Sequence, residues 1–252
     1  MAGKRDRRQS KPDYIRWMLV AGAAIMIAAL VVLVLERHHL LHRPASFDPD
    51  HYPVRGIDVS NHNGEVQWDL VAEQGYRFVY LKASEGATHI DARFRQNAQK
   101  AAAAGLKVGA YHFFRKNRDG EAQASNMLAA THGVALDLPL VVDVEDWEND
   151  HWQDEAEVRA RLRTMVSNLI RQGRRVMIYT NGDGYSKFYQ PNFPQLDLWL
   201  CSFNSPDSLR LTHGHTLQQY SHWGEVEGIE GDVDLDLFVG SEKEWKKWLD
   251  KR

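Results

Sequence analysis

The 252-residue chain has one cysteine, Cys201, and no excess of positive charge. A single cysteine excludes an internal disulfide framework and a Cys-rich zinc site. The net charge of −3 and the isoelectric point near 6.5 give no reason to expect nucleic acid as a partner. The sequence also lacks internal repeats and low-complexity segments. With 43% hydrophobic and 26% charged residues it is too apolar for disorder and too charged for a multi-span membrane protein.

No charged residue interrupts residues 17–35, a run of 19 apolar residues and glycine that would span roughly 28 Å as a helix. Before it, residues 1–16 hold six Lys or Arg and two Asp, a net charge of +4, so the remainder carries −7. This pattern predicts a single-pass anchor in the cytoplasmic membrane, with residues 1–16 inside and the rest outside the cytoplasm. A cleaved signal peptide is the rival interpretation, but no small-x-small site follows the run. Residues 36–52 are expected to form a linker.

From residue 53 to residue 252, short apolar runs rich in β-formers alternate with helical patterns. Eight strands are expected, at 54–60, 78–83, 107–113, 139–145, 175–180, 197–202, 216–221 and 233–238. Helices are expected at 66–74, 91–104, 120–131, 154–172 and 243–251, the second with Asp91 as N-cap and Gly105 after its end. Strand–helix alternation favours a mostly parallel sheet. The sequence predicts one α/β domain, a compact modified (β/α) barrel with few or short late helices.

Acidic residues fall where strands of such a barrel end, which is where active sites of this fold lie. Asp143 and Glu145 are two apart on a predicted strand, so they share a face. Two neighbouring carboxylates repel each other, and one pKa should rise, which favours a general acid for glycoside hydrolysis. A solvated acidic turn at a strand end would give the same spacing. Asp58 in an apolar strand is either a site residue or the buried partner of a cation. Asp234 and Asp236 again share a face.

Aromatic residues gather near the same strand ends and could stack on sugar rings, although single aromatics there are more often core. They include Tyr111, Tyr179 and Trp199.

Together these segments resemble the glycoside hydrolase family 25 lysozymes, the Chalaropsis-type N-acetylmuramidases. The matching motifs run in family order: GIDVS at 56–60, FVYLKASEG at 78–86, DARF at 91–94 with Asn97, GAYHF at 109–113, LPLVVDVE at 138–145, IYT at 178–180, LWL at 198–200, QYS at 219–221 and GDVDLD at 231–236. The resemblance implies hydrolysis of the β-1,4 bond between N-acetylmuramic acid and N-acetylglucosamine in peptidoglycan.

By position, the resemblance implies that Glu145 is the general acid and that Asp143 is its partner carboxylate. Asp143 would either orient the N-acetyl group of the substrate or stabilise charge at the anomeric carbon. Asp58 and Asp234 complete the acidic set. The substrate-binding candidates are Tyr111, Tyr179, Trp199, Gln219 and Glu85. No metal or cofactor is expected, and the protein is expected to act as a monomer.

The chain departs from the family at Gln218, where a Trp often precedes the Gln-Tyr pair, so a stacking platform should be lost. Two other functions compete with a membrane-anchored muramidase. One is a non-catalytic wall-glycan-binding module, against which the retained Asp143 and Glu145 count. The other is a metal-dependent hydrolase using the carboxylates and His112, although no dedicated metal motif is present.

Overall fold

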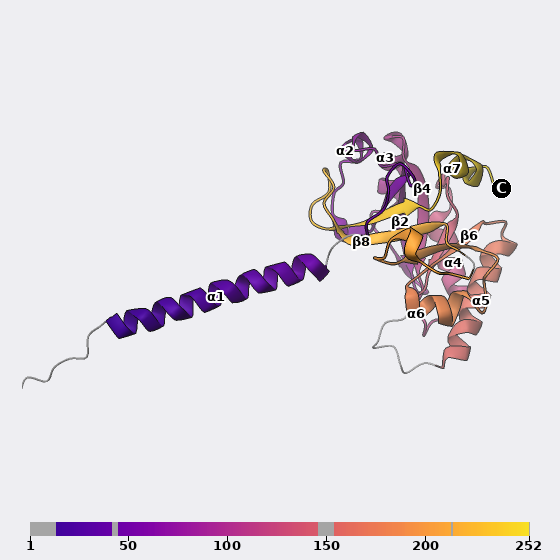
Figure 1. Cartoon of the computed structure of the whole chain (residues 1–252). Coiled ribbons are helices and arrows are strands. Elements are labelled where there is room, and N and C mark those ends of the chain that lie inside the picture. Colours follow the sequence, from indigo (N-terminus) through magenta and orange to yellow (C-terminus); the bar gives the residue numbers. More distant parts are fainter. Residues whose placement is uncertain (1–13, 42–44, 146–153, 213, 252) are drawn as a thin grey trace, which may run out of the picture. The chain divides into compact units, whose positions relative to one another are not determined.

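The computed structural model describes residues 14–41, 45–145, 154–212 and 214–251. The chain divides into two compact units, Met1–Arg43 and Pro44–Arg252. The first unit contains helix α1 (Tyr14–Leu41), drawn in indigo in Figure 1. Within the described residues, no helix combines the length and apolarity needed to cross a bilayer, so the span predicted at 17–35 is not confirmed. Most of the predicted basic tail, residues 1–13, lies outside the described residues.

The second unit alternates strands with helices. Its elements are β1 (Arg55–Val59), η1 (Asn61–Asn63), α2 (Trp68–Glu73), β2 (Phe78–Glu85), β3 (His89–Ile90), α3 (Phe94–Ala103), β4 (Lys107–Phe113), α4 (Gly120–Thr131), β5 (Leu140–Asp143), α5 (Glu155–Arg171), β6 (Val176–Thr180), α6 (Gly182–Gly184), η2 (Tyr185–Tyr189), β7 (Asp197–Cys201), η3 (Pro206–Ser208), β8 (Leu217–Gly224), β9 (Val233–Phe238) and α7 (Glu242–Leu249).

Eight of these strands close into a barrel, as predicted. The sheet runs β1-β9-β8-β7-β6-β5-β4-β2, and β1 pairs with β2 to complete the ring. All eight lie within two or three residues of their predicted bounds. The two-residue strand β3, which the sequence analysis did not predict, adds antiparallel to the end of β2 outside the ring.

Strand β9 runs antiparallel to both of its neighbours, β1 and β8, whereas the other barrel pairs are parallel. The β8–β9 connection is a hairpin, which needs no crossover helix. Because β9 is reversed, its first residues lie at the edge where the parallel strands end. Asp234 on β9 therefore pairs with Asp58 on β1.

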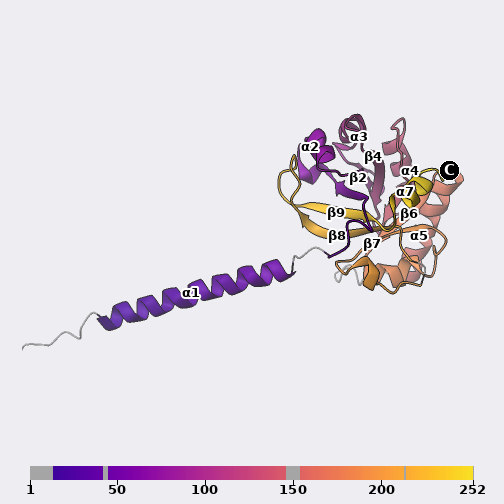
Figure 2. The same ribbon diagram turned by 45° about the horizontal axis from the view of Figure 1, so that its top comes forward.

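The early helices cover the outside of the barrel, and α4 and α5 pack against each other (Figures 1 and 2). The late part of the barrel has few and short helices, as predicted: between β6 and β8 the described residues form α6, η2 and η3. The predicted start of the second helix is wrong. Helix α3 begins at Phe94 with Arg93 at the N-cap position, and the Asp91 carboxylate instead accepts backbone N–H groups of Asn61 and Arg93, both at 2.9 Å.

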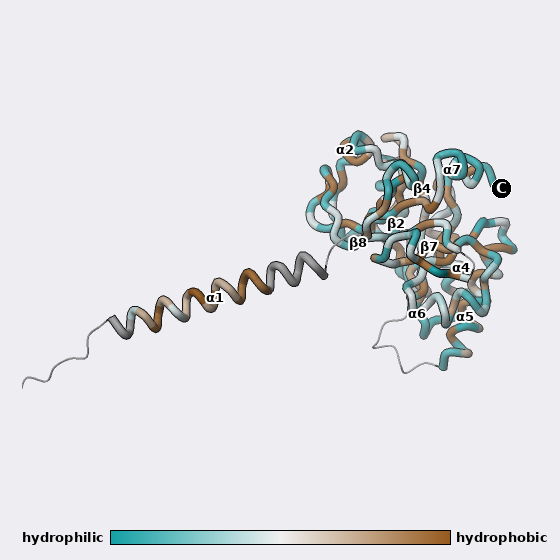
Figure 3. The backbone as a smooth tube through the Cα atoms, in the orientation of Figure 1, coloured by the Kyte–Doolittle hydropathy of each residue, from teal (hydrophilic) through white to brown (hydrophobic). Residues whose placement is uncertain are grey.

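The barrel interior below the acidic edge is filled with aromatic side chains. The Tyr80 ring packs on Trp199, with centroids 4.8 Å apart, and Phe78 packs on Trp245 of α7 at 5.3 Å. Gly109 makes room for this layer, because a Cβ there would lie 2.2 Å from the Tyr80 ring. Helix α7 shows mostly hydrophilic residues along its tube in Figure 3, but its buried Trp245 and Trp248 contact Phe238. The helix expected at 243–251 is confirmed as α7.

Candidate active site

A cavity of about 430 Å³ opens at the edge of the barrel where the parallel strands end. Eight of the nine sequence-predicted site residues line it: Asp58, Tyr111, Asp143, Glu145, Tyr179, Trp199, Gln219 and Asp234. The structure adds Ser60, His62, Lys82, Phe113 and His222 to the lining.

Asp143 and Glu145 both line this cavity, as the two-residue spacing predicts. Asp143 is the last residue of β5 and is 7% exposed, while Val142 and Val144 are buried in the layer outside the barrel. Burial raises the pKa of Asp143 well above its usual value, and the neighbouring charge of Glu145 raises it further. Among the described residues, no group donates a hydrogen bond to Asp143 Oδ1. That oxygen is buried, so the structure leaves a carboxyl oxygen in the cavity wall without a hydrogen-bond partner in the described part of the chain.

Three more carboxyl groups meet on β1 and β9. Burial raises the pKa of Asp58 to about 7, with the charge of Glu145 adding to the rise. Burial and the charge of Asp58 raise the pKa of Asp234 to about 8. Asp236 lies deeper at 0% exposure, and burial raises its pKa well above the usual value. Because these neighbouring buried carboxylates repel one another, they cannot all be ionised together. Among the described residues, an amide, that of Gln219, donates a hydrogen bond to Asp58, and no cation pairs with Asp58.

Gln219 connects the acidic group to the wall formed by β6 and β8. Its Nε2 donates to Asp58 Oδ2 at 2.7 Å, which opposes the rise in the Asp58 pKa. Its Oε1 accepts the Tyr179 hydroxyl at 2.7 Å and lies 2.7 Å from His222 Nε2. The amide orientation is thus fixed by three partners, and Gln219 acts as a support for Asp58.

Trp199 and Tyr111 occupy different depths of the cavity. Trp199 is 2% exposed, lies between the rings of Tyr80 and Tyr179, and donates its indole N–H to Asp236 Oδ1 at 2.9 Å. It forms the base of the cavity and supports the carboxyl group. The pKa of Tyr111 is raised well above its usual value by burial and by the charges of Asp58 and Asp143, so its hydroxyl remains a proton donor.

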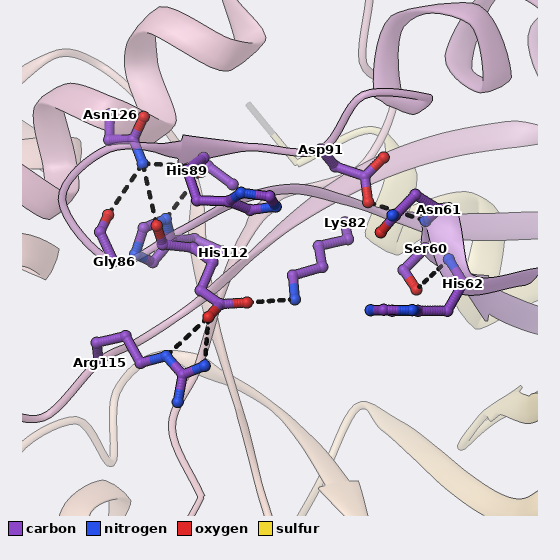
Figure 4. Close-up of polar contacts among 12 residues, drawn as sticks. Ser60, Asn61, His62, Lys82, Gly86, His89, Asp91, His112, Arg115 and Asn126 are labelled. Atoms are coloured by element: carbon purple, nitrogen blue, oxygen red, sulfur yellow. Dashed lines mark hydrogen bonds and ion pairs between the residues drawn. The ribbon is translucent and has the colours of Figure 1, made fainter.

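Glu85, the ninth predicted residue, lies in a neighbouring groove instead of this cavity. Its carboxylate bonds Lys82 Nζ at 2.6 Å and Arg115 Nε at 2.8 Å (Figure 4). Glu85 therefore forms ion pairs with two cations. Of these three residues, Lys82 lines the acidic cavity, whereas Glu85 and Arg115 line the neighbouring groove. The charge of Lys82 opposes the rise in the Asp143 pKa. Lys82 lines the cavity but was not among the predicted site residues, although strand alternation places it on the same face as Tyr80.

The loop after β1 forms one rim of the cavity through Ser60 and His62. Ser60 caps η1, its hydroxyl accepting the His62 N–H, and Asp91 holds the next residue by the Asn61 N–H (Figure 4). The residue that could have indicated this rim is Asp91, which holds the loop after β1. It was predicted to cap a helix instead.

Two expectations about neighbouring positions are wrong because strand residues alternate between faces. His112 is 0% exposed outside the barrel, with Nδ1 2.8 Å from Ser84 Oγ and Nε2 3.3 Å from Gln123 Oε1, so it does not join the carboxylates as a metal ligand. Gln218 also points outward and donates to the Ser202 and Asn204 carbonyl oxygens. A residue at 218 does not face the cavity, so the missing Trp removes no stacking platform from it.

Comparisons with known proteins agree with this geometry. Residues 57–229 match the model of the family described as glycosyl hydrolases family 25. The autolytic lysozyme of Clostridium acetobutylicum is 32% identical over 189 residues, 73% of this chain and 56% of its own length. Lysozyme M1 of Streptomyces globisporus is 32% identical over 209 residues, 75% of this chain and 68% of its own.

Among solved structures, a family 25 glycosyl hydrolase from Bacillus anthracis aligns with a TM-score of 0.72 at 29% identity, covering 82% of this chain and 97% of its own. This chain spans little more than half the length of the clostridial lysozyme. The match of the family model over most of the barrel shows that the chain belongs to glycosyl hydrolases family 25 and is a glycoside hydrolase of the lysozyme kind.

Proposed function

We propose that this protein is an N-acetylmuramidase that acts as a monomer and hydrolyses the β-1,4 bond between N-acetylmuramic acid and N-acetylglucosamine in peptidoglycan. The observation that carries the proposal is the acidic cavity, where Asp143 and Glu145 lie with Asp58 and Asp234. The chain belongs to a family whose members include lysozymes, and two relatives named as lysozymes are 32% identical to it over 189 and 209 aligned residues.

In this proposal Glu145 protonates the leaving glycosidic oxygen. Glu145 is partly exposed, and it lines both the cavity and the neighbouring groove, so a glycan crossing the edge of the barrel passes it. Asp143, which lines the cavity beside Glu145, acts as the partner carboxyl toward the N-acetyl group of the reacting sugar. Two carboxyl groups flanking the bond are the requirement for this hydrolysis.

The remaining lining residues hold the sugar and tune the acids. The Tyr111 hydroxyl donates a hydrogen bond near the cleavage point. Gln219 keeps Asp58 oriented through the 2.7 Å bond. Trp199, which is nearly buried, supports the base of the cavity instead of stacking on an exposed sugar face.

The test is to incubate the purified protein with peptidoglycan and to analyse the products by mass spectrometry after borohydride reduction. We expect muropeptides with newly reduced N-acetylmuramic acid from the wild type and none from Glu145→Gln. Glu225→Gln is the matched control, because Glu225 is exposed on the β8–β9 hairpin and does not line the cavity. Binding without cleavage by the wild type, across several wall types, would favour a glycan-binding module instead.

We also propose that the catalytic unit works outside the cytoplasm, tethered by residues 17–35 with residues 1–16 inside. The support is the uncharged 19-residue run and the +4 segment before it. Fractionation tests this location: the chain should sediment with membranes, resist carbonate extraction, and be cleaved from the outside by protease. Release of the full-length chain by carbonate would refute the tether.

A further inference from the structure

A second groove of about 470 Å³ adjoins the acidic cavity and differs from it in charge. The two share Phe113 and Glu145, so a ligand bound at the cleavage point extends directly from one into the other. The groove is lined by three cations, Arg115, Lys116 and Arg118, and by two carboxylates, Glu85 and Glu145. The Glu85 carboxylate is already paired with Lys82 and Arg115.

Arg118 is the cation that the structure leaves for a ligand. It is exposed, and its guanidinium makes no ion pair with any described residue. Arg115 and Lys116 differ, since the first pairs with Glu85 and the second lies 5.5 Å over the Phe188 ring at 8% exposure. The groove thus has one available guanidinium beside two fixed positive charges.

The two turns that form the groove are held rigidly by buried amides of helix α4. Gln123, 0% exposed, accepts the Arg115 N–H at 2.8 Å and donates to the carbonyl oxygens of Arg115 and Arg118, both at 3.1 Å. Asn126 donates to the carbonyl oxygens of Gly86 and His89, both at 2.9 Å (Figure 4). Buried amides with several partners fix backbone positions. The groove is therefore a preformed site.

A second buried contact orients the Gln123 amide. Ser84 Oγ lies 2.8 Å from His112 Nδ1, and His112 Nε2 lies 3.3 Å from Gln123 Oε1. Burial lowers the pKa of His112 to about 4, so the ring is neutral. A neutral ring that accepts a hydrogen bond from the Ser84 hydroxyl at Nδ1 carries its proton on Nε2. It therefore donates a hydrogen bond from Nε2 to Gln123 Oε1. Both ring nitrogens of His112 therefore have hydrogen-bond partners outside the cavity.

We propose that this groove binds the carboxylate-bearing peptide attached to the muramic acid of the substrate, with Arg118 as the contacting residue. The inference rests on the proposed muramidase function. A substituent of a sugar bound at the adjacent cleavage point would reach this groove, and the peptide on muramic acid is the substituent that carries carboxylates. Guanidinium groups pair with carboxylates by two parallel hydrogen bonds.

The test compares peptide-bearing glycan with the same glycan after an amidase has removed the peptides. Arg118→Glu should raise KM on the peptide-bearing glycan by roughly tenfold, as expected for losing one charged contact, and should leave the bare glycan within about twofold. Lys247→Glu is the charge-matched control. Lys247 is exposed on α7, whose Trp245 packs on Phe78 at the opposite end of the barrel. Equal effects of Arg118→Glu on both glycans, or none on either, would overturn the proposal.

A direct binding measurement separates this proposal from the proposed catalysis. Titration of the full chain with a soluble muramoyl tripeptide should show a Kd roughly tenfold weaker for Arg118→Glu than for the wild type or Lys247→Glu. Amidation of the peptide carboxylates should remove the difference. If wild-type protein cleaves neither glycan but retains this Arg118-dependent binding, the catalytic proposal fails and the peptide site stands. If the wild type cleaves the glycan but its binding of the tripeptide does not depend on Arg118, the peptide site fails and the catalytic proposal stands.

Discussion

Replacing Asp234 with asparagine should stabilise the protein at neutral pH while reducing activity. Burial and the charge of Asp58 raise the pKa of Asp234 from 3.8 to about 8. In the folded state this carboxyl keeps its proton up to about pH 8, whereas in the unfolded chain it loses the proton near pH 4. The contribution of Asp234 to the free energy of unfolding is therefore fully present below pH 4 and is lost as the pH rises toward 8. Asparagine does not titrate, so the variant does not suffer this loss.

The size of the effect follows from the shift. Each pKa unit corresponds to about 1.4 kcal/mol, so the interval from pH 4 to pH 7 gives an upper bound of about 4 kcal/mol. Asp234 is partly exposed, and Asp58 can hold a proton in its place, so the bound is not reached. We expect Asp234→Asn to be about 2 kcal/mol more stable than the wild type at pH 7 and about equal to it at pH 4.

Urea denaturation followed by tryptophan fluorescence at pH 4, 5, 6, 7 and 8 measures this difference. The control is Asp232→Asn, since Asp232 is exposed two residues earlier and should change the free energy of unfolding by less than about 0.5 kcal/mol at each pH. A stability gain that is independent of pH, or a loss at pH 7, would refute the reasoning from burial.

Two further predictions concern packing and the Asp58 support. Gly109→Ala should lower the free energy of unfolding by about 3 kcal/mol, because its Cβ would meet the fully buried Tyr80 ring at 2.2 Å. The control is Gly182→Ala, whose Cβ would have nothing within 4 Å and which should have little effect in the same urea assay. Gln219→Met should raise the pKa of Asp58 above about 7 by removing the 2.7 Å hydrogen bond to its carboxylate, which a shift of the Asp58 carboxyl ¹³C titration toward higher pH would report. An unchanged titration would contradict the support assigned to the Gln219 amide.

The barrel could be predicted because its strands are short apolar runs with sharp ends, and seven of the eight are connected in ways that parallel pairing allows. The reversal of β9 could not be predicted from its own residues. The alternating pattern of GDVDLD fits a strand that pairs parallel to its neighbours as well as one that pairs antiparallel. Only the hairpin connection to β8 fixes it. The same reversal explains why Asp234, at the start of a strand, meets Asp58 near the end of another.

The site was predictable where one strand supplied two residues to one face, and less so where different elements meet. The spacing of Asp143 and Glu145 placed both in the cavity. The pairing of Glu85 with Arg115 depends on the distance between the end of β2 and the turn after β4, which no local pattern encodes. The errors at His112 and Gln218 are different: alternation from Tyr111 and Gln219 already places them on the opposite face.

The raised pKa values imply that the acidic edge is held in place against its own repulsion. Asp58, Asp143, Asp234 and Asp236 would separate or admit water if the barrel could relax, because each is more stable solvated. Two features prevent this. The indole of Trp199, packed between Tyr80 and Tyr179, holds Asp236 from below, and the Gln219 amide holds Asp58 from the side. The aromatic layer therefore supports the acids as well as filling the barrel. A change that loosens this layer should lower the carboxyl pKa values before it unfolds the chain.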